Sequence, residues 1–376
     1  MKKKKLLINV NSIVPYYVSG KVSGIGRTTL ELIQALANID NLSFEIELYS
    51  QNMKGIGSRN AGLSFKCFHL YLPNRERWNK FLAKFPINEW FTGYDIMHIP
   101  HNSDCTENLQ KTIFTFHDLI IFRYPEMWGV NRNDESFFDN LKYLAQNCKA
   151  IVTCSESSKK DIVNFLNVPE KKVTSIPWGI NRKVFHPIYN QRFLKEKNIS
   201  SLYYFTASCN HPRKNLPLLL RSYRKYLMAG GRGQLVLLNP TISDLINERD
   251  LIDRNMVVIC QDVSDEELAV LYTHAHCSII VSEFEGFGLP VLESLACETL
   301  VLSAYNSSLI EVGGAVIDYF EELEESFISK KMLMYDEISK VDMINRNLVN
   351  EHLDKFSWEQ CAQNYIRFYE EQFYDG

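Results

Sequence analysis

Two glutamates on either side of a glycine-bearing turn have the spacing that points most directly to chemistry. Glu285 and Glu293 are separated by seven residues, which include Gly286 and Gly288. The apolar run 277–281 before them is typical of a buried strand, and a helix is expected after them. Ligands bind at the carboxyl ends of strands in open α/β sheets, where glycines and a helix start favour an anion. One interpretation is that the turn binds a phosphate, while Glu285 faces a reacting sugar and Glu293 binds hydroxyls.

The same residues also fit a purely structural interpretation. Glu285 could be an exposed turn residue. Glu293 could stabilise the first turn of the following helix by meeting its free N–H groups and its dipole. Pro290 supports a helix start here, because proline is common in the first helical turn. Cations close to the turn would favour the phosphate interpretation.

Two such cations occur in the segment Pro212-Arg213-Lys214-Asn215, between an expected strand at 203–207 and an expected helix. Arg213 and Lys214 could clamp a diphosphate, each charge-assisted hydrogen bond contributing roughly 1.5–3 kcal/mol. A solvated basic turn is the alternative. Because this loop and the Glu285 loop both follow strands of one expected sheet, we expect them at the same sheet edge.

The first half of the chain carries a similar arrangement. Gly24-Ile25-Gly26-Arg27 feeds an expected helix, but Thr29 stands where the third glycine of a dinucleotide-binding fingerprint would be. It could be only a tight turn. His117 ends an expected strand at 112–116, and both a structural and a catalytic role are open for it.

Composition argues against several classes of protein. A length of 376 residues favours two domains, and a formal net charge of −4 gives no electrostatic argument for nucleic acid. The nine cysteines form no Cys-x-x-Cys pair, which argues against a disulfide framework or a zinc site and favours a reducing cytoplasm. No Asp-x-Asp triplet occurs, so a Mg or Mn site of that pattern is not expected. No apolar run is long enough to cross a bilayer.

Strands and helices are expected to alternate twice along the chain, which predicts an α/β fold of two Rossmann-like, doubly wound domains. The polar stretch 181–201 interrupts the alternation. We expect an N-terminal domain at 1–185, a C-terminal domain at 186–355, and an amphipathic closing helix at 356–376 that packs back on the first domain. Strands are expected at 6–10, 44–49, 65–70, 96–99, 112–116, 150–154, 173–176, 203–207, 234–238, 256–259, 279–281 and 300–303.

Taken together, these motifs resemble a known family. The segment from Glu285 to Glu293 looks like the E-x7-E motif of retaining family 4 glycosyltransferases, which have the GT-B fold of two facing Rossmann-like domains. Residues 23–27 resemble their amino-terminal glycine loop, and His117-Asp118-Leu119 is similar to a motif of a subgroup that includes many bacterial mannosyltransferases. The resemblance covers essentially the whole chain. Further matching segments are 155–162, 176–180, 212–215 and 356–359.

The resemblance implies a role for each matching residue. Arg213 and Lys214 would bind the diphosphate of a nucleotide sugar, and Glu293 its ribose. Glu285 would act on the donor sugar near its reacting carbon, and His117 would contact that sugar from the other domain. Cations at the diphosphate and a carboxylate at the sugar would stabilise the charges that separate when the anomeric bond breaks. Further donor contacts are implied for Gly286, Phe287, Gly288 and Leu289, and for Gly24 and Gly26 of the glycine loop.

The chain departs from the family pattern at two places. Ser208-Cys209-Asn210 replaces an additional arginine that many members carry, so phosphate binding would depend more heavily on Arg213. Residues 303–308 replace a proline-enriched segment. Donor contacts through the amides of Ser307 and Ser308 are therefore in question.

The resemblance favours a cytoplasmic enzyme, at the inner face of the plasma membrane if it associates peripherally. It would transfer a hexose, with mannose from GDP-mannose favoured, to a glycan or lipid-linked acceptor in bacterial polysaccharide or lipopolysaccharide O-antigen assembly. No cofactor and no divalent metal is expected. The acceptor is expected near 75–90 or 122–128, whose aromatic and basic residues suit sugars or a lipid phosphate. Alternatives are a nucleotide-sugar epimerase of the same fold and a non-catalytic sugar-nucleotide binding protein.

Overall fold

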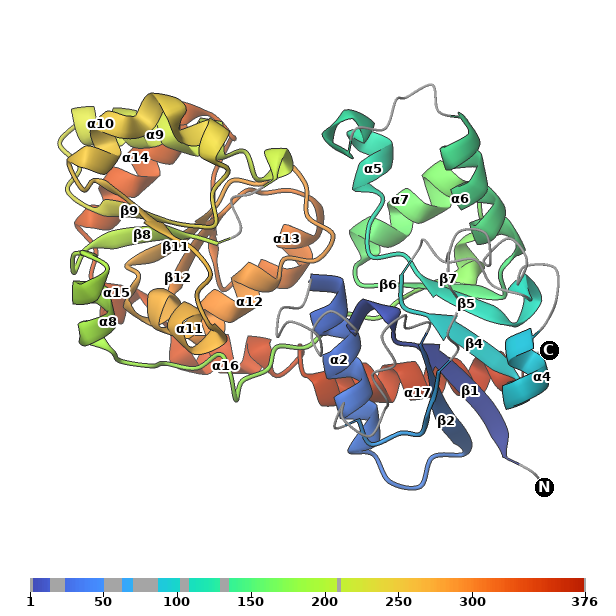
Figure 1. Ribbon diagram of the computed structural model, residues 1–376. Helices are drawn as coiled ribbons and strands as arrows, with labels where there is room; N and C mark the ends of the chain where they lie inside the picture. The colour runs from blue at the N-terminus through green and yellow to red at the C-terminus, as the bar shows by residue number, and fades with distance from the viewer. Residues whose placement is uncertain are drawn as a thin grey trace. The chain divides into compact units, whose positions relative to one another are not determined.

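The structure is a computed structural model that describes residues 3–13, 24–50, 63–69, 87–101, 108–128, 135–207 and 211–374. The chain forms two compact units (Figure 1). Unit 1 comprises residues 1–179 together with 358–376, and unit 2 comprises residues 180–357. Each unit is an α/β unit built on its own parallel sheet, so the predicted fold class is confirmed.

In the described part of unit 1 the sheet has seven strands in the order β3-β2-β1-β4-β5-β6-β7, with every neighbouring pair parallel. Parallel sheets are covered on both faces, which explains their continuous apolar runs. In β1, Leu6 and Ile8 belong to one core and Leu7 to another, and all three are fully buried. The strands are β1 (Lys4–Asn9), β2 (Phe44–Ser50), β3 (Cys67–His69), β4 (Ile96–Ile99), β5 (Thr112–Thr115), β6 (Ala150–Thr153) and β7 (Val173–Ser175).

Two helices distant in sequence share the first of these cores. Helix α2 (Gly24–Ala37) and the C-terminal helix α17 (Trp358–Tyr374) pack against each other and against β1 and β2 (Figure 1). The apolar residues of α17 recur at helical spacing, which fits this buried face. The second core lies under α6 (Glu135–Asn147) and α7 (Glu156–Leu166). Shorter helices of unit 1 are α4 (Ile87–Thr92) and α5 (Ile120–Arg123), with the 3-10 turns η1 (Asn11–Ile13), η3 (Leu109–Lys111), η4 (Pro125–Trp128) and η5 (Glu170–Lys172).

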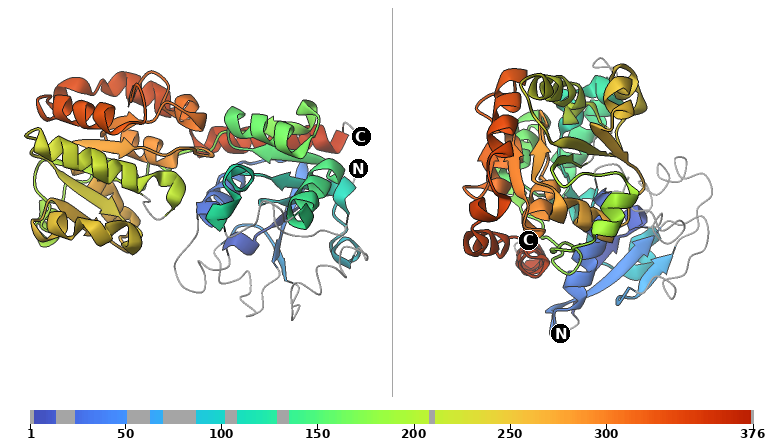
Figure 2. Two further views of the ribbon diagram at one scale, coloured as in Figure 1. Left: turned by 90° about the horizontal axis from the view of Figure 1, so that it is seen from above. Right: turned by 90° about the vertical axis from the view of Figure 1, so that its left-hand side faces the viewer.

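In the described part of unit 2 the sheet has six parallel strands in the order β10-β9-β8-β11-β12-β13. Tyr204 of β8 faces a core formed with α9 (Leu216–Met228) and α14 (Glu325–Asp336), whereas Phe205 packs on Tyr272 of α11 (Asp265–His274). Helices therefore cover both faces (Figure 2). The strands are β8 (Tyr203–Thr206), β9 (Gln234–Leu238), β10 (Val257–Cys260), β11 (Cys277–Ile280), β12 (Leu300–Ser303) and β13 (Asp318–Tyr319).

Several short elements of unit 2 were not expected from the sequence pattern. Strand β13 has only two residues, and helix α8 (Gln191–Glu196) lies within the polar stretch 181–201. Such short segments carry too little periodicity to be recognised. The remaining elements are α8 (Gln191–Glu196), η6 (Pro212–Lys214), η7 (Ile242–Glu248), α10 (Arg249–Asp253), α12 (Leu289–Ala296), α13 (Ser307–Gly313), α15 (Lys340–Met343) and α16 (Arg346–Leu353).

The strand order places one switch of direction in the unit 2 sheet. From β8 the chain proceeds through β9 to β10 on one side, and β11 then lies on the other side of β8. Loops leaving the carboxyl ends of two such strands diverge and leave a crevice where ligands bind. The loops after β8 and β11 carry the cations and the first glutamate singled out above.

Among the helices that the structure describes, none combines the length and the apolar character needed to cross a bilayer.

Candidate functional site

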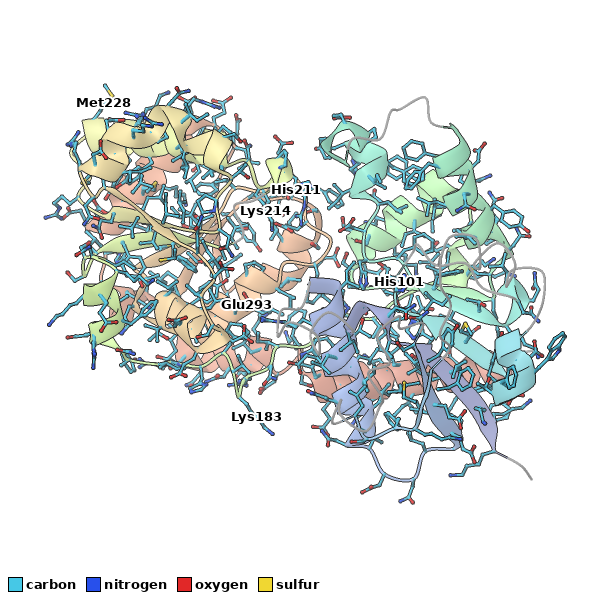
Figure 3. All side chains as sticks on the ribbon, viewed as in Figure 1. His101, Lys183, His211, Lys214, Met228 and Glu293 are labelled. Carbon is cyan, nitrogen blue, oxygen red and sulfur yellow. The ribbon has the colours of Figure 1, made fainter. Side chains whose placement is uncertain are left out.

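The loop after β8 presents two cations side by side. Pro212 to Lys214 form the short helix η6, and Asn215 adopts a left-handed conformation (φ 55°) before α9 begins. The side chains of Arg213 and Lys214 are only 19% and 10% exposed. His211, next to Lys214 in Figure 3, accepts a hydrogen bond through its ring from the Arg213 N–H at 3.3 Å. This local winding holds both cations close to the end of β8.

Glu285 brings a buried carboxylate directly onto these cations. Arg213 Nη1 donates to Glu285 Oε2, and Lys214 Nζ donates to Oε1 at 2.5 Å. Ser282 Oγ also donates to Oε1, at 2.7 Å. Burial alone would raise the pKa of Glu285, but the charges of Lys214 and Arg213 outweigh it and lower the pKa to about 2. The carboxylate is therefore ionised at neutral pH.

The backbone of the Glu285 loop is tied to the start of α13. The Glu285 N–H donates to Ser307 Oγ at 3.0 Å, and Ser308 Oγ donates to the Glu285 carbonyl at 2.8 Å. Arg213 Nη1 also donates to the Phe284 carbonyl at 3.0 Å. These serine hydroxyls lie in the segment where the chain departs from the family pattern. Their role in holding the loop was missed from the sequence, because residues more than twenty positions away leave no periodic signal.

Gly288 fixes where helix α12 begins. Its φ is +111°, and a Cβ there would come within 3.1 Å of Leu309 Cδ2, so both conformation and space favour glycine. The helix starts immediately afterwards, at Leu289. Glu293 therefore lies in the second turn, and its predicted place in the first turn was wrong because this left-handed residue starts the helix earlier. Phe287 is buried and packs edge-to-face on Phe356, with ring centroids 6.2 Å apart.

Glu293 is held by a neighbour that the sequence did not single out. Tyr272 Oη donates to Glu293 Oε2 at 2.8 Å, and the Glu293 residue is only 8% exposed. Tyr272 belongs to α11, and its ring packs on Phe205 of β8 at 5.0 Å. Figure 3 labels Glu293 on α12. An aromatic residue within a buried helix face gives no separate sequence signal for this contact.

In unit 1, His117 follows β5, and the two nitrogens of its imidazole ring differ in their hydrogen bonding. Its Nε2 bonds the Pro100 carbonyl at 3.0 Å, so this nitrogen carries the hydrogen. Burial is the main reason that the pKa of His117 falls to about 4. The ring is therefore neutral at pH 7 and its Nδ1 is a hydrogen-bond acceptor. Within the described parts of the chain this buried Nδ1 has no hydrogen-bond partner.

A small cavity of about 10 Å³ lies beside the His117 ring. That volume is close to the space of one water molecule. The Trp178 ring packs on the His117 ring, with centroids 5.2 Å apart. The cavity is lined by Thr28, Thr29, Leu32, Pro100, Thr115, His117, Trp178, Trp358 and Tyr365.

The glycine loop of unit 1 is described only in part. Gly24 opens α2, and a Cβ built there would meet nothing within 4 Å, so space does not demand a glycine. Gly26 is buried. Ser23 lies outside the described residues, as do Ser208-Cys209-Asn210 and most of the predicted acceptor segment 75–90. The other acceptor segment, 122–128, contributes to α5 and η4.

Over the residues that the structure describes, no group of three or more His, Cys, Asp or Glu side chains is arranged to hold a metal ion. The seven described cysteines are free thiols.

Family models match both halves of the chain. The model of Glycosyltransferase Family 4 matches residues 22–184, and that of Glycosyl transferases group 1 matches residues 178–314. Among curated proteins, O-antigen chain mannosyltransferase B of Escherichia coli is 24% identical, over 93% of this chain and 96% of that protein. A probable sucrose-phosphate synthase of Thermosipho melanesiensis is 27% identical, over 74% of this chain and 66% of that protein. RfbU, an O-antigen chain mannosyltransferase of Salmonella typhimurium, is 26% identical over 52% of each chain.

Solved structures share the fold at lower identity. Sucrose-phosphate synthase of Thermosynechococcus elongatus matches all of both chains with a TM-score of 0.71 and 16% identity. Alr3699/HepE of Anabaena, in complex with UDP-glucose, matches 98% of this chain and 99% of its own with a TM-score of 0.71 and 13% identity. WaaG, a glycosyltransferase involved in lipopolysaccharide biosynthesis, matches 99% and 100% with a TM-score of 0.70 and 10% identity. With two parallel-sheet units and family models on both halves, the chain belongs to the family 4 glycosyltransferases of GT-B fold and resembles their mannosyltransferase-like subgroup.

Proposed function

We propose that this glycosyltransferase is a retaining, metal-independent enzyme that moves a hexose from a nucleotide sugar to a glycan or lipid-linked acceptor. The observation that carries the proposal is the contact of Arg213 and Lys214 with Glu285 at the carboxyl ends of β8 and β11. Two cations that are more than four-fifths buried, at a direction switch of a parallel sheet, suit a diphosphate. The ionised carboxylate beside them suits the positive charge that develops on a sugar.

The proposed chemistry separates charge at the anomeric carbon. The bond from that carbon to the diphosphate breaks, and the acceptor oxygen bonds to the carbon from the same face. The leaving phosphate oxygen takes the acceptor's proton. The anomeric configuration is retained because the new bond forms on the face from which the diphosphate leaves. Arg213 and Lys214 stabilise the diphosphate, while Glu285 stabilises the oxocarbenium-like sugar without attacking it. Arg213 and Lys214 supply the positive charge that a divalent metal supplies in other enzymes, which supports metal independence.

Other residues are proposed to hold the donor. Glu293, oriented by Tyr272, would accept hydrogen bonds from ribose hydroxyls. His117 Nδ1 is a neutral, buried acceptor and would suit a sugar hydroxyl as donor. Backbone N–H groups of the Gly286–Leu289 turn and of the Gly24–Gly26 loop would contact the sugar and phosphates.

Mannose from GDP-mannose is the proposed donor, because O-antigen chain mannosyltransferase B is similar over 93% of this chain. The same similarity supports a place in bacterial O-antigen assembly, with a peripheral position at the inner face of the plasma membrane. UDP-glucose is the competing donor, since HepE, with its shared fold, was solved with it.

A donor screen followed by product analysis tests the proposal. Thermal unfolding is measured with GDP-mannose, UDP-glucose, GDP and UDP. A ligand at 100 times its dissociation constant adds about 2.7 kcal/mol to the free energy of unfolding, and GDP-mannose should give the largest shift.

Transfer to a mannose-containing acceptor, with and without a metal chelator, should then give an α-linked product by NMR. An inverted product, or loss of transfer with the chelator, would contradict the proposed mechanism. A new nucleotide sugar formed without acceptor would indicate an epimerase instead.

A further inference from the structure

The Glu285 carboxylate is bound to Arg213 and Lys214, the same two side chains that would bind the donor's phosphates. One oxygen accepts from Arg213 and the other from Lys214. Both cations and the carboxylate are at least four-fifths buried. A buried cation without a counter-ion is costly, so the carboxylate stabilises this pair while the site is empty.

Among the three side chains of this cluster, positive charge exceeds negative charge. Arg213 and Lys214 together carry two positive charges, and Glu285 supplies one negative charge. A diphosphate carries at least two negative charges and offers several acceptor oxygens. It therefore matches the two cations better than the single carboxylate does.

We propose that Glu285 is an internal anion that holds the phosphate-binding cations in the empty site and is displaced from them by the donor's diphosphate. The inference rests on the proposed function and adds a step to it. Displacement frees an ionised carboxylate at the moment when the donor sugar arrives. Donor binding thus prepares the group that stabilises the sugar.

The surrounding hydrogen bonds allow the side chain to move while the backbone stays in place. The Glu285 N–H and carbonyl are bound to Ser307 and Ser308, as described above. Asn306 Nδ2 donates to the Ser282 carbonyl at 3.0 Å, which fixes the other end of the turn. Rotation about the Glu285 side-chain bonds would take the carboxylate off the cations, with loss of the hydrogen bond from Ser282 Oγ. The exchange therefore needs no rearrangement of the loop.

Exchange predicts that removing the carboxylate's charge will strengthen binding of a bare diphosphate. Inorganic pyrophosphate is the probe, because it needs neither base nor sugar. Its binding is measured by calorimetry with the full chain and with Glu285→Gln. The variant should bind pyrophosphate at least about tenfold more tightly than the unmodified chain, although we expect it to lose sugar transfer.

Glu283→Gln is the matched control. Glu283 is exposed and two residues away, and the substitution removes the same charge from the same turn. Its pyrophosphate affinity should stay within about twofold of the unmodified chain. Equal tightening in both variants would reduce the effect to net charge and overturn the proposal, as would unchanged or weaker binding in Glu285→Gln.

A crystal structure of the unmodified chain with pyrophosphate gives a test that does not depend on the variant's folding. Phosphate oxygens should contact Arg213 Nη1 and Lys214 Nζ, with the Glu285 carboxylate turned away from both. Pyrophosphate bound elsewhere, or Glu285 still on both cations, would overturn the exchange. Failure of pyrophosphate and of all nucleotide sugars to bind would overturn the proposed function as well. Binding of pyrophosphate without displacement leaves the proposed function intact and overturns the exchange alone.

Discussion

The candidate functional side chains of the two units differ in charge and in whether their polar atoms have hydrogen-bond partners. In unit 2, Arg213, Lys214 and Glu285 form an ionic cluster in which both carboxylate oxygens accept hydrogen bonds. In unit 1, His117 is neutral at pH 7, and its Nδ1 has no partner in the described residues. The first arrangement is suited to charges that change during a reaction, and the second to uncharged hydroxyls.

The difference follows from what surrounds each group. Glu285 is 5% exposed, but two neighbouring cations keep its carboxylate ionised. Among the residues that the structure describes, no anion raises the pKa of His117 in the same way: burial lowers it to about 4, and the hydrogen bond with the Pro100 carbonyl compensates only in part. Burial disfavours a charge in both units, but only in unit 2 do neighbouring cations outweigh it.

The largest effect is expected from a substitution that breaks the ionic cluster. Glu285→Gln should lower transfer by about 100-fold or more, as for other groups aimed at transition-state charge. The loss should appear in kcat, because the carboxylate interacts with charge that develops during the reaction. Steady-state kinetics with GDP-mannose and a mannose-containing acceptor measure it.

Glu283→Gln removes an exposed carboxylate from the same turn and should keep transfer within about twofold of the unmodified chain. A Glu285→Gln enzyme with nearly full activity would show that the cluster is structural. That result would favour a binding protein whose carboxylate only keeps the loop folded.

A second prediction separates the units by their response to acid. Burial, with His117 and His101 nearby, lowers the pKa of His98 from 6.5 to about 3. His98 and His117 are therefore neutral in the folded state but take up protons when unfolded. Stability from these residues is fully present above pH 6.5 and is lost as pH falls, at about 1.4 kcal/mol per pH unit for each independent group. The pKa of Glu285 falls from 4.5 to about 2, so its contribution is lost only below pH 4.5.

Between pH 7 and pH 5, unit 1 should therefore lose more stability than unit 2. In unit 2 the pKa values of His211 and His274 are lowered by less, and Glu285 keeps its contribution. The five tryptophans make this measurable, since all lie in unit 1: Trp78, Trp90, Trp128, Trp178 and Trp358. The melting temperature from tryptophan fluorescence should fall on acidification, ahead of a second transition in far-UV circular dichroism. Equal shifts in both signals would contradict the prediction.

A smaller effect is expected at Tyr272, whose hydroxyl group donates a hydrogen bond to the Glu293 carboxylate. Tyr272→Phe removes the donor to Glu293 Oε2 and should raise the KM for the nucleotide sugar about fivefold, equivalent to about 1 kcal/mol. Because ribose is held equally throughout the reaction, kcat should change little. Tyr189→Phe, which alters a tyrosine that is 74% exposed, should leave both constants unchanged. A fall in kcat for Tyr272→Phe would place Glu293 closer to the reacting bond than proposed.

Most of the strand positions could be predicted because parallel strands buried on both faces are continuous apolar runs. The runs at Ile96–Ile99 and Gln234–Leu238 were predicted without error in their bounds. Ends were less certain, as in β11, which ends at Ile280, one residue before the apolar run 277–281 does. The two-residue strand β13 has no periodicity to detect.

The sequence by itself determined which residue types stand at the strand ends, namely cations after β8 and a glutamate with glycines after β11. It also determined that the chain folds as two α/β halves, because the apolar pattern repeats. Only the tertiary structure decided that Arg213, Lys214 and Glu285 bind one another. It also decided that Tyr272 holds Glu293 and that Ser307 and Ser308 hold the Glu285 loop. Strand order and side-chain direction decide such contacts, and both arise from packing between segments that are far apart in the chain.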